Sequence, residues 1–159
     1  MNEYGQPETL LKLASNTLNA ILDGLKLIGD EDRDKIMRLC GEACAKEKMW
    51  GSSIEIADKI SREEKEIDKI IKRLNNEISW CGEWIRNGKI ISSNCSVCGC
   101  PLVRHKIVKN TDVFCHCSKG WIETIFSTLL KKPVKSKLVK TIGRGDSECR
   151  FQVHYEGSF

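Results

Sequence analysis

Cysteine is the residue type in this sequence with the clearest capacity for chemistry. The chain of 159 residues contains nine cysteines, and five of them fall between positions 95 and 117. These five are Cys95, Cys98, Cys100, Cys115 and Cys117. Thiolates select soft or borderline metal ions, so this density indicates a metal site more readily than chance burial. An odd number of cysteines in a reducing compartment also argues against a disulfide framework.

The spacing of the cysteines supports a metal site. The segment from Cys95 to Cys100 is a C-x-x-C motif overlapping a C-x-C motif. A C-x-x-C turn lets two thiolates reach one ion, and Gly99 relieves the backbone strain of that turn. A second C-x-C motif surrounds His116. If this segment is a strand, its two cysteines point to one face and His116 points to the other.

Zinc is the metal that this pattern favours, because two short cysteine clusters separated by a hairpin-sized gap suit a closed tetrahedral site. Two alternatives remain at this point. Four cysteines also serve an iron–sulfur cluster. Without any metal, the cysteines would pack as small buried hydrophobes.

The other cysteines and the histidines give weaker signals. Cys40 and Cys44 are four residues apart on an expected helix, so they either complete a site with Cys81 or pack on the core side, as their apolar neighbours favour. His105 and His154 fall in expected strands as ordinary strand residues. A reactive thiol would need a nearby cation or a helix N-terminus. No catalytic triad or phosphate-binding glycine motif can be assembled.

Composition indicates a soluble chain that can bury its own core, with 40% hydrophobic and 30% charged residues. The net charge of +4 is uneven, since residues 1–94 carry −2 and residues 95–159 carry +6. Part of the excess is a cluster of lysines, namely Lys131, Lys132, Lys135, Lys137 and Lys140. Lysines guard strand edges, and without stacking aromatics a nucleic-acid partner is not expected. We find no secretory signal and no membrane-spanning run, so a cytoplasmic location is expected.

Hydrophobic periodicity predicts a helical N-terminal segment over residues 1–88. A helix is expected from Pro7, with its apolar residues running to Leu25, and a second helix after Gly29. The Ser61-Arg62-Glu63-Glu64 segment reads as a capping box that opens a third clear helix. That helix carries an apolar stripe of Ile67, Ile70, Ile71, Leu74 and Ile78. The stripe is expected to pack in the core, or alternatively to pair with a second copy of the chain.

After Gly88 the pattern predicts an α+β domain over residues 89–159. Strands are expected near 89–92, 102–108, 111–117, 134–142 and 148–155, with a helix from Lys119 to Leu130. The Gly143-Arg144-Gly145-Asp146 segment predicts a hairpin turn. The predicted fold class is therefore α+β, with the helical half packed on a small antiparallel sheet and one long helix.

Several of these segments resemble a known family. The residues are Phe114 to Trp121, then Pro133-Val134, then the Ile142–Phe151 segment with its glycine-rich turn and Cys149-Arg150-Phe151. Residues 90–155 resemble the vinyl reductase type of small-molecule-binding domain. The order Cys-Gly-Cys-Pro then Cys-x-Cys-Ser-x-Gly-Trp is similar to uncharacterised bacterial cysteine-rich proteins, which in turn are similar to the thiazoline-carboxylate hydrolase family at the C-terminal turn.

The vinyl reductase resemblance implies an α+β domain that encloses an apolar ligand and is often a homodimer. In phenol-sensing members it implies a structural zinc, and Cys115 and Cys149 align with two of its ligands. The other two ligand positions fall on Leu138 and Thr141, which cannot replace a glutamate and a cysteine. We therefore expect Cys95, Cys98, Cys100 or Cys117 to supply the missing thiolates.

The expected function is a small-molecule-binding or sensing module with a structural zinc–thiolate site. The candidate metal ligands are Cys95, Cys98, Cys100, Cys115, Cys117 and Cys149. The candidate walls of a pocket for a small organic ligand are Trp121, Phe126 and Phe151. The alternatives are an iron–sulfur protein and an enzyme, either a hydrolase with a metal-bound water or a thiol or redox enzyme.

Overall fold

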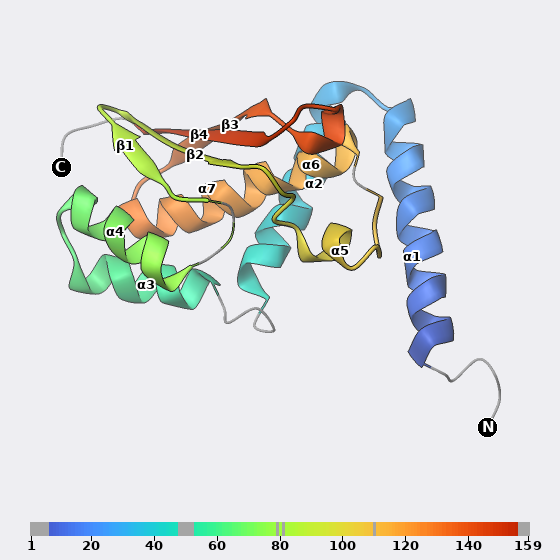
Figure 1. Cartoon of the computed structure of the whole chain (residues 1–159), viewed down its shortest axis with the longest axis horizontal. Helices are drawn as coiled ribbons and strands as arrows, with labels where there is room; N and C mark the ends of the chain where they lie inside the picture. Colours follow the sequence, from blue (N-terminus) through green and yellow to red (C-terminus); the bar gives the residue numbers. More distant parts are fainter. Residues whose placement is uncertain (1–6, 48–52, 79, 81, 110, 156–159) are drawn as a thin grey trace.

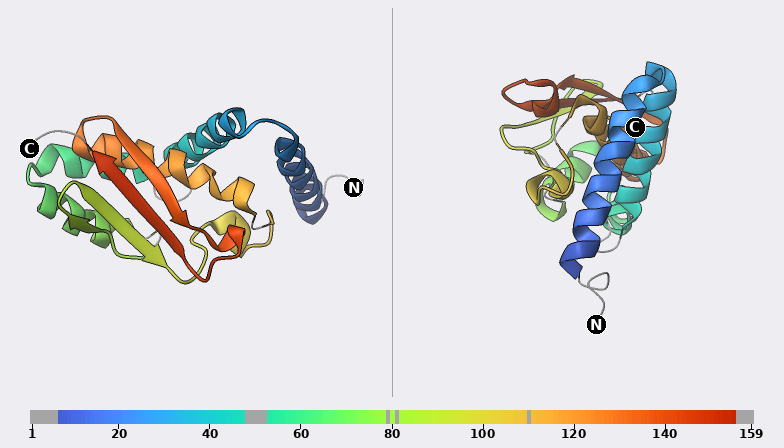
Figure 2. Two further views of the ribbon diagram at one scale, coloured as in Figure 1. Left: turned by 90° about the horizontal axis from the view of Figure 1, so that it is seen from above. Right: turned by 90° about the vertical axis from the view of Figure 1, so that its right-hand side faces the viewer.

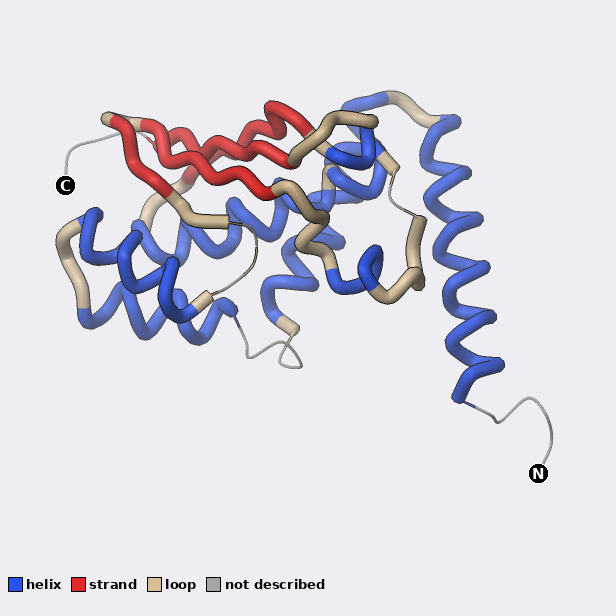
Figure 3. Tube along the Cα trace, in the orientation of Figure 1, coloured by secondary structure: helices blue, strands red, loops and turns tan. Residues whose placement is uncertain are grey.

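The computed structural model describes residues 7–47, 53–78, 80, 82–109 and 111–155, so Cys81 lies outside the described residues. The described part combines helices with a four-stranded antiparallel sheet, which confirms the α+β prediction. In Figures 1 and 3 the strands form one layer, and the helices other than α1 gather on one side of it.

The first two helices begin where the sequence predicts. Helix α1 spans Pro7–Gly24, a short 3-10 turn η2 spans Leu25–Leu27, and α2 spans Asp30–Lys46. The acidic first turn of α2 is favourable at a helix N-terminus. Helix α1 stands beside the rest of the molecule in the left view of Figure 2. The expectation that Cys40 and Cys44 pack on the core side was wrong, because both are exposed.

Helices α3 (Ser53–Glu63) and α4 (Ile67–Glu77) form a pair. The predicted capping box was wrong, because Ser61 lies in the last turn of α3 and its hydroxyl donates to the Asp58 carbonyl 2.9 Å away. The apolar stripe of α4 is buried in the protein's own core. The alternative that this stripe pairs with a second copy of the chain was wrong, because the stripe is already covered by other residues of the same chain.

The sheet has the order β1-β2-β4-β3, with β1 at Ile85–Asn87, β2 at Ile90–Cys95, β3 at Val134–Lys140 and β4 at Cys149–Tyr155. Strand β4 alternates buried and exposed residues, which is the pattern of a sheet with one face on a core. In the register of β2 with β4, Cys95 lies opposite Cys149. Strand β3 is an edge strand, so its lysines lie where edge protection is needed.

Two predicted strands are helices. The segment expected as strand 102–108 contains α5 at Pro101–Arg104, and the segment expected as strand 111–117 contains α6 at Asp112–Cys115. Pro101 occupies the first turn of α5, where its missing N–H costs nothing. Thr111 caps α6 by accepting a hydrogen bond from the Phe114 amide at 3.3 Å. These local capping signals outweigh the β-branched residues in between.

Helix α7 spans Cys117–Leu130 and confirms the predicted long helix. It lies between the sheet on one side and α2 and α3 on the other. The main core joins residues of α3 and α4 to α7 and the sheet, including Ile60, Leu74, Phe126 and Val153. The predicted domain boundary at residue 88 stays a prediction, and one hydrophobic core contains residues from both sides of it.

Candidate thiol cavity

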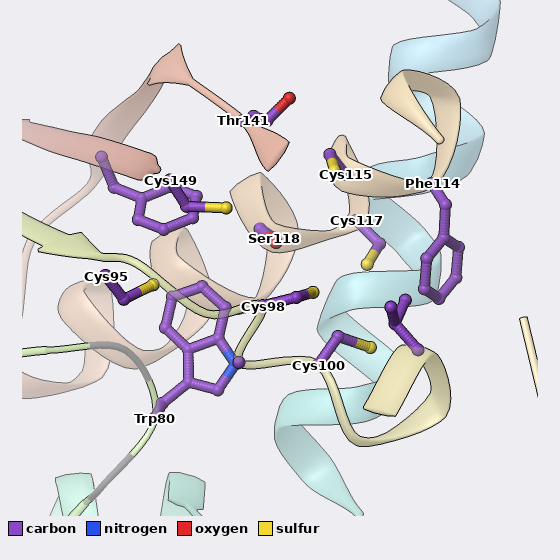
Figure 4. A pocket seen from close by; sticks show the side chains of 13 residues that line it. Trp80, Cys95, Cys98, Cys100, Phe114, Cys115, Cys117, Ser118, Thr141 and Cys149 are labelled. Carbon is purple, nitrogen blue, oxygen red and sulfur yellow. The ribbon is translucent and has the colours of Figure 1, made fainter. Parts of the chain in front are cut away.

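All six predicted metal ligands line a single cavity at one end of the sheet (Figure 4). The cavity has a volume of about 20 Å³. That volume exceeds the roughly 10–15 Å³ that one water-sized sphere requires, but falls far short of an organic ligand. The residues that line the cavity are Trp80, Cys95, Cys98, Gly99, Cys100, Val103, Phe114, Cys115, Cys117, Ser118, Thr141, Cys149 and Phe151. None of them carries a formal positive charge.

Three segments of the chain supply the sulfur atoms. Cys95 ends strand β2, and Cys98 and Cys100 follow in the loop that leads to α5. Cys149 begins strand β4 and is only 5% exposed. Cys95 is disulfide-bonded, so the structure differs here from the expectation that disulfides are absent. The cysteines at positions 98, 100, 115, 117 and 149 form no disulfide.

The Cys115-His116-Cys117 segment is a helical corner, and the expected strand geometry was wrong. Cys115 is the last residue of α6, and Cys117 is the first residue of α7. His116 turns away from the cavity, because its Nδ1 lies 2.7 Å from Oδ1 of Asp34 on α2. Lys119 donates to the same carboxylate oxygen at 2.5 Å. Helix α2 therefore fixes the corner, and His116 serves as an anchor in the described structure.

The turn between β3 and β4 closes the cavity on the sheet side. Thr141 is completely buried, and its amide donates to the Asp146 carboxylate at 2.8 Å. The amide of Ile142 donates to Sγ of Cys149 at 3.4 Å, which holds that sulfur in place. Gly145 has a φ of +101°, a conformation that glycine adopts without strain. The predicted turn at residues 143–146 is confirmed, in the form of the 3-10 turn η4 at Ile142–Arg144.

Burial favours the protonated form of four cavity thiols. It raises the pKa of Cys115 to about 11, although Thr141 and the backbone at Gly143 partly oppose the shift by hydrogen bonding. Burial also raises the pKa of Cys117 well above its usual range, with further contributions from neighbouring thiols. The pKa of Cys100 and that of Cys149 are raised by burial as well. A thiolate here would therefore need a cation beside it.

The buried thiols raise one another's pKa. The pKa of Cys115 is raised by Cys149 and Cys98, after burial, and the pKa of Cys149 is raised by Cys98. The pKa of Cys117 is raised, after burial, by Cys100 and Cys44 more than by Cys115 or Cys40. The pKa of Cys100 is also raised by Cys98, after burial, so the two cysteines of the first C-x-C motif act on each other as well.

Among the residues that the structure describes, no three Cys, His, Asp or Glu side chains are already gathered closely enough to hold a metal ion. Side-chain rotation would be needed to bring the cavity sulfurs onto one ion. His105 and His154 are exposed and do not line the cavity.

The predicted ligand-pocket residues belong to the core. Phe126 is completely buried, and Trp121 and Phe151 are nearly so. Phe151 also lines the thiol cavity, and Trp121 lines a second, open hollow of about 330 Å³ beside it. This hollow includes Cys44, Trp80 and Arg104.

Sequence reasoning missed Trp80 as a residue of the site. Its ring stacks on Trp121 with centroids 4.6 Å apart and lies 5.2 Å from the ring of Phe151. Trp80 thereby separates the thiol cavity from the open hollow, since it lines both. No motif marks this tryptophan, because its position depends on how α4 and the sheet come together.

The fold and the site define an α+β protein with a cysteine-lined cavity. The chain belongs to a family of unknown function, DUF6144, whose model matches residues 23–158. A comparison with curated proteins finds no match. No helix in the described part of the chain is long and apolar enough to span a membrane.

Proposed function

We propose that this protein is a binding or sensing module that holds Zn²⁺ between the thiolates of the cavity. The observation that carries the proposal is that six cysteines from three segments line one uncharged cavity of single-ion size. Thiolates are ligands that zinc prefers, and structural zinc sites are closed sites of this kind.

The raised pKa values favour a metal site over a nucleophilic cysteine. A reactive cysteine needs its pKa lowered by a cation or a helix N-terminus. Here burial is the largest influence on Cys115 and Cys149, and it raises the pKa of both thiols. A bound cation would supply the missing positive charge, so the thiols would lose their protons when the ion enters.

Four of the cysteines form the preferred ligand set, which we call the cavity set: Cys95, Cys98, Cys115 and Cys149. The C-x-x-C spacing suits Cys95 and Cys98 as a pair of ligands on one ion, once the disulfide of Cys95 is reduced. Cys115 and Cys149 are also the two residues that the vinyl reductase resemblance aligns with zinc ligands. The ion would join the β2–α5 loop to the helical corner and β4, and its binding free energy would add to the stability of the fold.

The open hollow next to the cavity supports the small-molecule part of the proposal. Its volume of about 330 Å³ falls at the lower end of the range for organic ligands. Trp80 and Trp121 offer aromatic surface there, and Arg104 offers a positive charge. A ligand in this hollow would contact Trp80, whose other side faces the thiols.

The experiment is metal analysis of protein purified without air and in the presence of a thiol reductant. We expect zinc to co-purify in at least one equivalent per chain, and Cys115→Ser and Cys149→Ser each to lose one equivalent. Ser118→Ala is the matched control, because Ser118 lines the cavity without a thiol. This variant should retain the metal.

Two results would reject the zinc proposal. Unchanged metal content in both cysteine variants would show that the cavity set holds no ion. A brown sample containing iron and labile sulfide would show instead an iron–sulfur cluster on the same thiols. Circular dichroism of each variant establishes that a loss of metal is not a loss of fold.

A further inference from the structure

Cys40 and Cys44 of α2 lie outside the proposed zinc site, yet the structure places them against it. Both are exposed on a helix that is otherwise held tightly to α7. The backbone of α2 at Gly41, between these two cysteines, lies against the carbonyl group of Cys117. The two cysteines therefore flank the point where α2 meets the start of α7.

The loop before α5 approaches the same place from the other side. Cys44 lines the open hollow together with Gly99 and Pro101, the two neighbours of Cys100 in the sequence. Figure 4 shows the side chains of Cys100 and Cys117 extending toward each other. Cys40, Cys44, Cys100 and Cys117, which we call the α2 set, thus lie around one region. As in the cavity set, side-chain rotation would be needed to bring their sulfurs onto one ion.

Cys100 and Cys117 are each the second cysteine of a C-x-C motif whose first cysteine belongs to the cavity set. The spacing of four residues between Cys40 and Cys44 places both on one face of α2, as two ligands of one ion require.

We propose that Cys40, Cys44, Cys100 and Cys117 form a second four-thiolate site for a soft cation of the zinc class, distinct from the cavity set. The ion would join α2 to the α5 loop and to the start of α7. Because Cys40 and Cys44 are exposed, this ion exchanges with solvent faster than an ion in the enclosed cavity. The proposal does not depend on the first site, because the two sites share no ligand.

The test is zinc stoichiometry in the full chain, purified without air under reducing conditions. The wild type should bind two equivalents, and the double variant Cys40→Ser/Cys44→Ser should bind one. Both substitutions are at exposed positions, so the fold should be retained. Ala43→Ser is the matched control, since Ala43 is exposed on the same turn of α2 and carries no thiol. It should keep both equivalents.

Exchange kinetics give a second measurement. When a chromogenic chelator is added to the zinc-loaded protein, the wild type should release zinc in two phases. The fast phase should be missing in Cys40→Ser/Cys44→Ser and present in Cys115→Ser/Cys149→Ser. Equal zinc content and equal release in the wild type and in Cys40→Ser/Cys44→Ser would overturn the proposal.

The outcomes separate the two sites. A single equivalent that is lost only in Cys115→Ser/Cys149→Ser supports the cavity set and refutes the α2 set. A single equivalent that is lost only in Cys40→Ser/Cys44→Ser supports the α2 set and refutes the cavity set.

Discussion

Gly41 of α2 and Cys117 of α7 are in backbone contact, with no room for a side chain between them. A Cβ built on Gly41 would lie 2.7 Å from the amide nitrogen of Trp121 and closer still to the carbonyl oxygen of Cys117. Gly120 makes the reciprocal approach to the backbone of Arg38. Two glycines, one on each helix, therefore let α2 and α7 approach at the position of the thiols.

The first prediction concerns this contact. Gly41→Ala should lower the free energy of unfolding by roughly 2–4 kcal/mol, because backbone atoms rather than a flexible side chain must move aside. Urea denaturation followed by circular dichroism measures the change. Gly24→Ala is the control, because nothing lies within 4 Å of a Cβ there, and it should be nearly neutral or slightly stabilising. Equal stability of both variants would contradict the close approach.

The second prediction concerns Asp34, which joins α2 to the helical corner. Its carboxylate lies 2.7 Å from His116, 2.5 Å from Lys119 and 2.7 Å from Arg38, which also pairs with Glu123. Partial burial raises the pKa of Asp34, but the hydrogen bonds from Lys119, Arg38 and His116 outweigh it and lower the pKa below its usual value of 3.8. Asp34→Asn should cost about 1–3 kcal/mol at neutral pH.

The sign of the pH dependence follows from the lowered pKa of Asp34. Its stabilising contribution is complete above the unfolded-state pKa of about 4 and is lost as pH falls through the folded-state value. The difference in free energy of unfolding between the wild type and Asp34→Asn should therefore be constant above pH 5 and shrink as the pH falls below 4. A difference that does not change with pH would exclude this role of the carboxylate. Asp32→Asn, at an exposed position on the same helix, is the control.

The third prediction concerns protons and metal at the cavity. The pKa of Cys115 is about 11 in the metal-free fold, against an ordinary value of 9.0. The unfolded chain therefore loses this proton at a lower pH than the folded chain, so metal-free protein should lose stability as pH rises from 9 toward 11. Thermal unfolding with chelator present measures this loss, which Cys115→Ser should reduce. The absence of any difference would show that the thiol titrates normally.

The fourth prediction uses Trp80 as a reporter of the cavity. Co²⁺ has an open d shell and should quench Trp80 emission when it occupies the cavity set, whereas Zn²⁺ should quench much less. Trp80→Phe should remove most of this quenching. Trp84→Phe is the matched control, because Trp84 packs against Phe126 with centroids 4.7 Å apart and does not line the cavity. Quenching that persists in Trp80→Phe and disappears in Trp84→Phe would place the ion elsewhere.

The sequence by itself determined the elements whose signals are local. Pro7 marked the start of α1, the apolar stripe of α4 marked a core helix, and Gly143 to Asp146 marked the turn before β4. Each signal depends on hydrogen bonding or periodicity within a few residues, so it can be read without knowledge of the fold. The concentration of cysteines after residue 94 pointed in the same way to the region that forms the cavity.

Only the tertiary structure decided which cysteines lie together. It turned the Cys115-His116-Cys117 segment into a helical corner, directed His116 to Asp34, and placed Cys44 in one hollow with Gly99 and Pro101, the neighbours of Cys100. These relationships join residues up to 82 positions apart. They depend on the close approach of α2 to α7. No pattern along the chain encodes that approach, because Gly41 and Gly120 matter for packing only where the two helices meet.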